Sequence, residues 1–113
     1  MHHVCSAVEM SELDRRTIEE FGVPGRVLME LAGRGVAQAV MERAPSGSRI
    51  IVACGPGNNG GDGFVCARAL AAARYAVEVA VFASRGRLRG DALAAFHTLE
   101  REGSAEIRFV EDA

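Results

Sequence analysis

The sequence predicts an α/β fold with a parallel sheet, and three observations support this prediction. Residues 49–54, Arg-Ile-Ile-Val-Ala-Cys, are one arginine and a continuous apolar run that begins with three β-branched residues, and turn residues bound the segment, which is typical of a strand buried in a parallel sheet. A glycine-rich turn follows directly, and beyond it helical and strand-like periods alternate as β-α-β-α-β. Hydrophobic residues make up 49% of the 113 positions and charged residues 25%, which is ordinary for one soluble globular domain.

Two helices are expected before the first buried run. Ser6 and Glu9 have the spacing of a capping box, in which a hydroxyl and a carboxylate accept hydrogen bonds from the amides at a helix start. We expect this helix to end near Phe21 and Gly22 to close it in a left-handed conformation. A second helix is predicted over 27–42 from apolar residues at helical spacing.

The elements after the glycine-rich turn are a helix over 64–74, a strand over 77–82, a helix over 91–102 that Gly103 closes, and a strand over 106–110. This order implies parallel strands joined by right-handed crossovers, which is a Rossmann-like, three-layer αβα arrangement. The chain ends directly after the third of these strands, where functional loops of such sheets lie. We therefore expect residues 1–113 to be one truncated domain whose C-terminal half is missing.

Composition excludes several classes of protein. All thirteen basic residues are Arg, so there is no Lys for a Schiff base or for a Walker-type phosphate site, and a net charge of −2 gives no reason to expect nucleic-acid binding. The three cysteines form no CxxC pair and indicate reduced, buried thiols, with packing favoured over a nucleophilic role for Cys54. No signal peptide and no membrane-length apolar run are visible, so a cytoplasmic location is expected.

The glycine-rich turn carries the chemistry that we predict. Residues 55–63, Gly-Pro-Gly-Asn-Asn-Gly-Gly-Asp-Gly, contain five glycines, which allow positive φ and close approach of the backbone to a ligand. The amides at the start of the following helix, together with the helix dipole, favour a phosphate. Asn58 and Asn59 offer amide groups to a ligand, and their oxygens suit a hard cation beside the phosphate.

Asp62 has two interpretations that are compatible with each other. In one it is the N-cap of a helix that begins at Gly63, because aspartate is among the best N-cap residues. In the other its carboxylate accepts a hydrogen bond from a ribose or a reacting group. A purely structural turn is the alternative for the whole segment, but it needs fewer glycines and asparagines than are present.

Two common motifs fit the turn poorly. Gly55, Gly57 and Gly60 match the dehydrogenase fingerprint GxGxxG, which also expects an acidic residue at the end of the next strand. Residues 82–85, Phe-Ala-Ser-Arg, have none; Arg85 could instead face a 2′-phosphate, although a solvated side chain is the more common state. The P-loop fails as well, because no Gly-Lys-Ser/Thr follows the turn.

A longer pattern resembles the NAD(P)H-hydrate epimerase family, also known as the YjeF N-terminal domain. Its parts are Leu-Met-Glu-Leu-Ala-Gly at 28–33, the turn at 55–63 and Gly-Asp-Ala at 90–92, together with residues 7–10 and 13–14 of the first predicted helix. The Asn-Asn-Gly-Gly-Asp-Gly core is highly specific, and Gly-Asp-Ala alone is weak. The resemblance covers essentially the whole chain.

The resemblance implies an isomerase of nicotinamide nucleotide repair, which interconverts the R and S hydrates of NADH and NADPH. It assigns substrate binding to Asn58, Asn59, Gly60, Gly61 and Asp62, and a potassium ion to Asn59. It further implies that the substrate is one of these hydrates, NADHX or NADPHX, and that the protein works together with an ATP- or ADP-dependent NAD(P)H-hydrate dehydratase. A homodimer is compatible with it, whereas nucleic acid and membrane are not expected partners.

The resemblance also implies that some functional residues of the family lie outside positions 1–113. The proposed catalytic Asp, the remaining potassium ligands and much of the substrate contact come from segments after the third predicted strand, so no catalytic residue is assigned here. Our hypothesis is that the 113-residue chain alone binds weakly and does not epimerise. Two alternatives stay open: a non-catalytic nucleotide-binding or dimerisation module of the same fold, and a fragment of an NADP-dependent oxidoreductase.

Overall fold

The computed structural model describes residues 2–5, 22 and 24–110, with side chains for 22, 24–57 and 60–110. The predicted helix that ends near Phe21 lies outside these ranges. The described elements, in order, are β1 (His2–Cys5), α2 (Gly25–Arg43), β2 (Arg49–Cys54), α3 (Asn58–Ala72), β3 (Ala76–Val81), the 3-10 helix η2 (Arg85–Arg87), α4 (Gly90–Glu102) and β4 (Glu106–Phe109).

The predicted alternation of strands and helices is confirmed. β2 has the expected bounds, and α2, β3, α4 and β4 each begin and end within two residues of the prediction. Gly103 closes α4 with φ +65°, as expected for a glycine at a helix end, and Gly22 has the predicted left-handed φ of +67°. The start of α3 is the main difference, because the helix begins at Asn58, six residues before the predicted Phe64.

Strand β1 was not predicted from the sequence. It pairs in parallel with β2, from His2 opposite Arg49 to Cys5 opposite Val52. Only two of its four residues are apolar, so it has no local pattern that separates it from a loop. Its strand conformation comes from pairing with a segment more than forty residues away in the chain.

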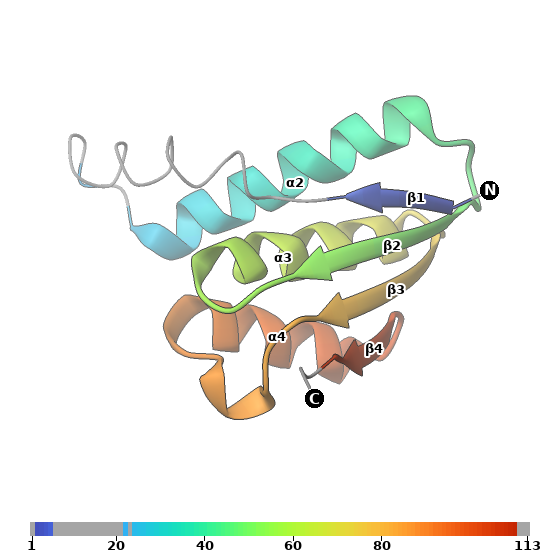
Figure 1. Cartoon of the computed structure of the whole chain (residues 1–113). Coiled ribbons are helices and arrows are strands. Elements are labelled where there is room, and N and C mark those ends of the chain that lie inside the picture. The colour runs from blue at the N-terminus through green and yellow to red at the C-terminus, as the bar shows by residue number, and fades with distance from the viewer. Residues whose placement is uncertain (1, 6–21, 23, 111–113) are drawn as a thin grey trace.

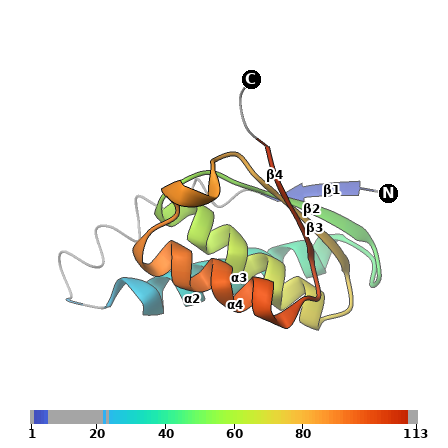
Figure 2. The same ribbon diagram turned by 90° about the horizontal axis from the view of Figure 1, so that it is seen from below.

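The four strands form a parallel sheet in the order β1-β2-β3-β4 (Figure 1). Each strand lies beside its predecessor on the same side, so successive crossovers of one hand place α2, α3 and α4 on one face of the sheet (Figure 2). The expected arrangement has three layers, a sheet between two layers of helices. The described residues form two of these layers, the sheet and one layer of helices. α3 lies between α2 and α4 and packs closely against both.

The core lies between the sheet and this helical layer. β2 and β3 alternate between fully buried residues on the helical side and partly buried residues on the other side. The sequence indicated that β2 is covered on both faces, but in the described part of the chain only one face is covered. The largest side chains of the core, all less than 2% exposed, are Phe64, Phe96, Ile50, Leu70, Leu99, Val52, Val79 and Val81.

The other face of the sheet is mixed in character. Ile51, Ala53 and Ala80 are half-buried there, and Phe82 is 54% exposed just beyond β3. An ion pair between Glu78 and Arg108 joins β3 to β4 on this face. Among the described helices none is long and apolar enough to cross a membrane.

Candidate functional site: the turn between β2 and α3

The turn between β2 and α3 occupies the edge of the sheet where the strands have their carboxyl ends. The amide of Phe82 donates to the carbonyl of Cys54 at 2.7 Å, and the amide of Val110 donates to that of Val81 at 2.7 Å, so the three strand ends stay in register here. In parallel α/β folds this edge is the usual place for ligands. The glycine-rich turn is thus in the position that the sequence analysis expected.

Gly57 makes the change from strand to helix possible. It has φ +86° and ψ −164°, a backbone conformation that residues with a Cβ rarely adopt, and it precedes the first helical residue, Asn58. The first bond of the helix runs from the amide of Gly61 to the carbonyl of Gly57 at 3.3 Å. The amides of Asn58, Asn59 and Gly60 therefore precede the intrahelical bonding pattern and are the donors that a helix start offers to an anion.

At three of the glycines an added Cβ would overlap a neighbouring group of the protein itself. A Cβ on Gly60 would overlap the carbonyl oxygen of Gly55, and one on Gly63 would lie 2.5 Å from the Sγ of Cys54. A Cβ on Gly61 would overlap the side chain of Met29 from α2. The sequence predicts that these glycines let a ligand approach the backbone closely; the structure shows that they also bring α3 close to its own neighbours.

The predicted N-cap role of Asp62 is wrong. The N-cap of α3 is Gly57, and Asp62 lies in the second turn of the helix, where it is 2% exposed and is the buried charged residue among those described. The error has a physical origin: six residues rich in glycine and asparagine have low helix propensity, yet packing against α2 and α4 overrides it. The contact of Asp62 with substrate stays a prediction.

The backbone of Asn58 and Asn59 begins α3, and the direction of their side chains is outside what the structure describes. Their assignment to substrate, and that of Asn59 to a potassium ion, are not tested by the geometry. Amide and carbonyl oxygens are suitable ligands for a hard cation. The part of the chain with described side chains contains no group of three or more His, Cys, Asp or Glu that could hold a metal.

Arg85, which the sequence offers as a partner for a 2′-phosphate, contacts groups of its own chain in this structure. Its guanidinium lies 5.0 Å from the ring centroids of both Phe96 and Phe109, and Nη2 is 3.1 Å from a carboxylate oxygen of Glu100. These contacts hold η2 against α4 and β4, where the cation also gains from the aromatic faces.

The Leu-Met-Glu-Leu-Ala-Gly segment of α2 packs against α3. A Cβ on Gly33 would lie 2.5 Å from the Cβ of Val65 and 2.7 Å from the carbonyl oxygen of Asp62. Nη2 of Arg68 donates to both carboxylate oxygens of Glu30 at 2.6 and 2.8 Å. The sequence carries no signal for this pairing, because the two residues are 38 positions apart and no local pattern connects them.

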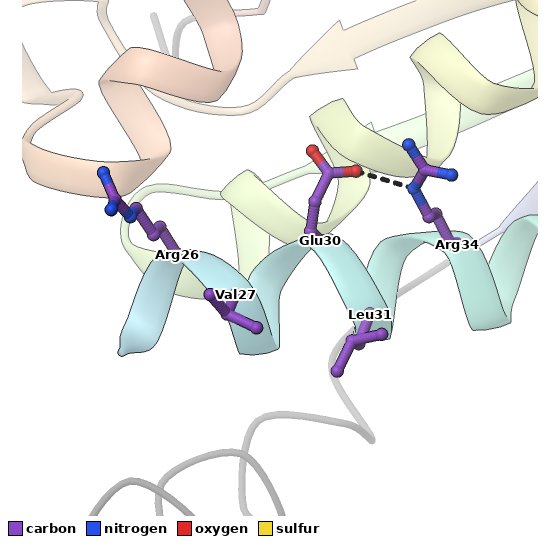
Figure 3. Close-up of a pocket in the computed structure, with 5 residues that line it drawn as sticks. All are labelled: Arg26, Val27, Glu30, Leu31 and Arg34. Atoms are coloured by element: carbon purple, nitrogen blue, oxygen red, sulfur yellow. Dashed lines mark hydrogen bonds and ion pairs between the residues drawn. The ribbon is translucent and has the colours of Figure 1, made fainter. Parts of the chain in front are cut away.

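Glu30 is held in its charged form. Partial burial opposes ionisation, but hydrogen bonds from Arg34 and Arg68 and the charges of both guanidinium groups outweigh it and lower the pKa of this carboxyl group. Arg34 donates through Nε at 2.9 Å (Figure 3). The result is a charged link between α2 and α3.

A pocket of about 570 Å³ opens on the exposed side of α2 (Figure 3). Among the described residues it is lined by Arg26, Val27, Glu30, Leu31 and Arg34. None of the predicted site residues belongs to this set. The described residues that line this pocket are therefore different from those of the turn between β2 and α3.

Comparison with known proteins agrees with the resemblance stated above. Residues 25–112 match the family YjeF_N, described as YjeF-related protein N-terminus. An NAD(P)H-hydrate epimerase of Rhodopirellula baltica is 47% identical over 81 residues, which are 72% of this chain and 33% of that protein. A bifunctional NAD(P)H-hydrate repair enzyme Nnr of Salinibacter ruber is 40% identical over 110 residues, 93% of this chain and 20% of that protein.

A solved structure has the same fold. The crystal structure of the yeast protein YNL200c superposes with a TM-score of 0.73 at 32% sequence identity, covering 94% of this chain and 46% of the yeast chain. The chain thus spans about a third of the epimerase relative from Rhodopirellula baltica and less than half of the yeast protein. With the family match over residues 25–112, the α/β fold and the glycine-rich turn in its expected place, the chain belongs to the YjeF-related N-terminal family.

Proposed function

We propose that the protein acts in the epimerisation of hydrated NADH and NADPH, as an isomerase of nicotinamide nucleotide repair. The observation that carries the proposal is the start of α3: helical geometry begins at Asn58, directly after Gly57 with its positive φ, at the carboxyl edge of the sheet. The relatives that match this chain are named NAD(P)H-hydrate epimerase or bifunctional repair enzyme.

In this proposal the turn binds and orients the substrate. The amides of residues 58–60 donate hydrogen bonds to a phosphate of the dinucleotide, and the helix dipole adds a favourable field at the same place. The side chains of Asn58, Asn59 and Asp62 contact the substrate, and the oxygen of Asn59 contributes one ligand to a potassium ion. When bound, that ion would supply positive charge beside the phosphate. The proton transfers of epimerisation are assigned to groups that these residues do not include.

The proposal extends to partners. Because several relatives are named as bifunctional repair enzymes, we assign this protein to a shared task with an ATP- or ADP-dependent dehydratase that consumes the S hydrate. Action in the cytoplasm and a homodimer belong to the same proposal. The alternative is a non-catalytic nucleotide-binding or dimerisation module of the same fold, in which the same turn would bind a nucleotide without proton transfer.

The two candidates are separated by an epimerisation assay on separated R and S hydrates of NADPH, followed by chromatography. We expect no acceleration by the 113-residue protein, and clear acceleration by a chimera in which residues 1–113 replace the matching part of the Rhodopirellula baltica epimerase. Replacing Asn59 by Leu in that chimera should abolish the acceleration. A folded chimera that binds NADP⁺ but does not epimerise would favour the binding module, and full activity of the Asn59→Leu chimera would refute the site.

A further inference from the structure

The hydrophobic side chains of the helical layer form two separate clusters. The larger lies between the sheet and the helices and contains the core residues named above. The smaller consists of Met29 from α2, Val65 from α3 and Ala92 from α4, with Ala95 partly buried beside it. One residue from each helix therefore meets at this second place, which the main core does not include.

The smaller cluster touches the backbone of α3 next to the proposed substrate-binding turn. A Cβ on Gly61 would lie 2.5 Å from Sδ of Met29 and 3.1 Å from the Cα of Ala92, so Gly61 is enclosed between α2 and α4. One residue later, the carbonyl of Asp62 lies against Gly33 of α2. Gly61 and Asp62 of α3 are thus in contact with the neighbouring helices. They directly follow residues 58–60, whose amides are proposed to bind the phosphate.

The position of the smaller cluster limits what its loss would disturb. A groove of about 260 Å³ runs over it on the outer side of the helical layer, lined by α2, α3 and α4. Met29 is 5% exposed and lies at the base of this groove rather than under the sheet. Shortening its side chain would open the cluster toward solvent and leave the side chains of the main core in contact.

We propose that Met29, through its contact with Gly61, is a positioning residue for the first turn of α3. The inference deepens the proposed function and rests on it for the ligand. Residues 55–57 join α3 through Gly57, and the backbone of Gly57 does not by itself fix the position of the helix start. The thioether of Met29 fixes that position, because it holds Gly61 against Ala92. Since Gly61 carries the first intrahelical bond, its placement determines where the amides of 58–60 lie.

The test compares Met29→Ala with Leu99→Ala in the 113-residue protein without ligand. Leu99 is fully buried in the main core, on α4, and loses a side chain of similar size. Amide hydrogen exchange is measured at residues 61–63 and at Val79 in the centre of β3. For Met29→Ala we expect the ratio of exchange at 61–63 to that at Val79 to rise at least tenfold, and for Leu99→Ala we expect no change in this ratio.

Two further measurements complete the test. Met29→Leu retains an apolar side chain of similar volume and should restore the wild-type ratio to within twofold. NADP⁺ titration should show weaker binding for Met29→Ala than for Leu99→Ala when both are studied well below their melting temperatures. An equal rise of exchange at 61–63 and Val79, or equal affinity of the two variants, would overturn the proposal. Absence of NADP⁺ binding by the wild type would instead count against the proposed function, and the exchange ratio would still decide the positioning role.

Discussion

Two glycines of α2, only two residues apart, should respond in opposite ways to the same substitution. In a helix interior the change from glycine to alanine normally stabilises a protein by about 1 kcal/mol, because alanine loses less conformational freedom on folding. Gly35 is exposed, and an added Cβ would meet nothing within 4 Å. Gly35→Ala is therefore expected to stabilise the protein by about 1 kcal/mol.

Gly33 faces α3, and there the added methyl group has no space. Its Cβ would lie 2.5 Å from the Cβ of Val65, against an ordinary contact distance of at least 3.4 Å, so the helices would have to separate by about 0.9 Å. A backbone carbonyl, that of Asp62, lies 2.7 Å away and cannot change rotamer. Overpacking costs about 1–3 kcal/mol, and we take about 3 because backbone must move.

Subtracting the helix-propensity gain of about 1 kcal/mol leaves a net loss of about 2 kcal/mol for Gly33→Ala. The two variants should then differ by about 3 kcal/mol, or roughly 12 °C in melting temperature for a domain of this size. Urea denaturation followed by the helical circular dichroism signal measures the difference directly. If Gly33→Ala were as stable as Gly35→Ala, the close approach of α2 and α3 on which the site geometry depends would be refuted.

Three further predictions concern the core and the charged link between α2 and α3. Phe96→Ala should lower the free energy of unfolding by about 3–5 kcal/mol in urea titrations. The reason is that the ring is fully buried and that its centroid lies 5.4 and 5.6 Å from the centroids of two other aromatic rings. A loss below about 1 kcal/mol would contradict the place of Phe96 in the core. Tyr75→Phe should cost about 1 kcal/mol, because its hydroxyl donates at 2.9 Å to the buried carbonyl of Ala44, and unchanged stability would argue against that bond. Glu30→Gln should cost about 0.5–1 kcal/mol at pH 7, a modest figure because the carboxylate is 37% exposed. Since folding lowers the pKa of Glu30 below its ordinary 4.5, the stabilisation is present above that value and disappears as pH falls through the lower folded pKa. A stability difference between wild type and Glu30→Gln that does not shrink as the pH is lowered below 4.5 would refute this explanation.

Much of the fold could be predicted because its signals are local. The run at Arg49–Cys54, the glycine after α4 and the periodic helix α2 each carry their pattern within a few residues, and the structure places them as expected. β1 and the first turns of α3 could not be predicted, since pairing with β2 stabilises the former and packing against Met29 and Ala92 the latter. In both cases tertiary contacts override weak local propensity.

The candidate site was predictable in place but not in geometry. The turn at 55–63 stood out by composition, and its position at the carboxyl edge follows from any parallel α/β topology. The assignment of Asp62 as N-cap failed because the helix start was judged from propensity alone. The pairing of Glu30 with Arg68 and the contact of Met29 with Gly61 join segments far apart in sequence, and only the folded chain shows them.

The central claim is that the backbone amides at the start of α3 bind a phosphate of the nucleotide. An NMR titration of the ¹⁵N-labelled 113-residue protein with NADP⁺, with nicotinamide riboside as the control ligand that carries no phosphate, tests it most directly. We expect saturable shifts with NADP⁺ that are largest at the amides of Asn58, Asn59 and Gly60, and no such shifts at these amides with nicotinamide riboside. Saturable shifts elsewhere that leave these three amides unchanged, or no saturable shift with either ligand, would contradict it.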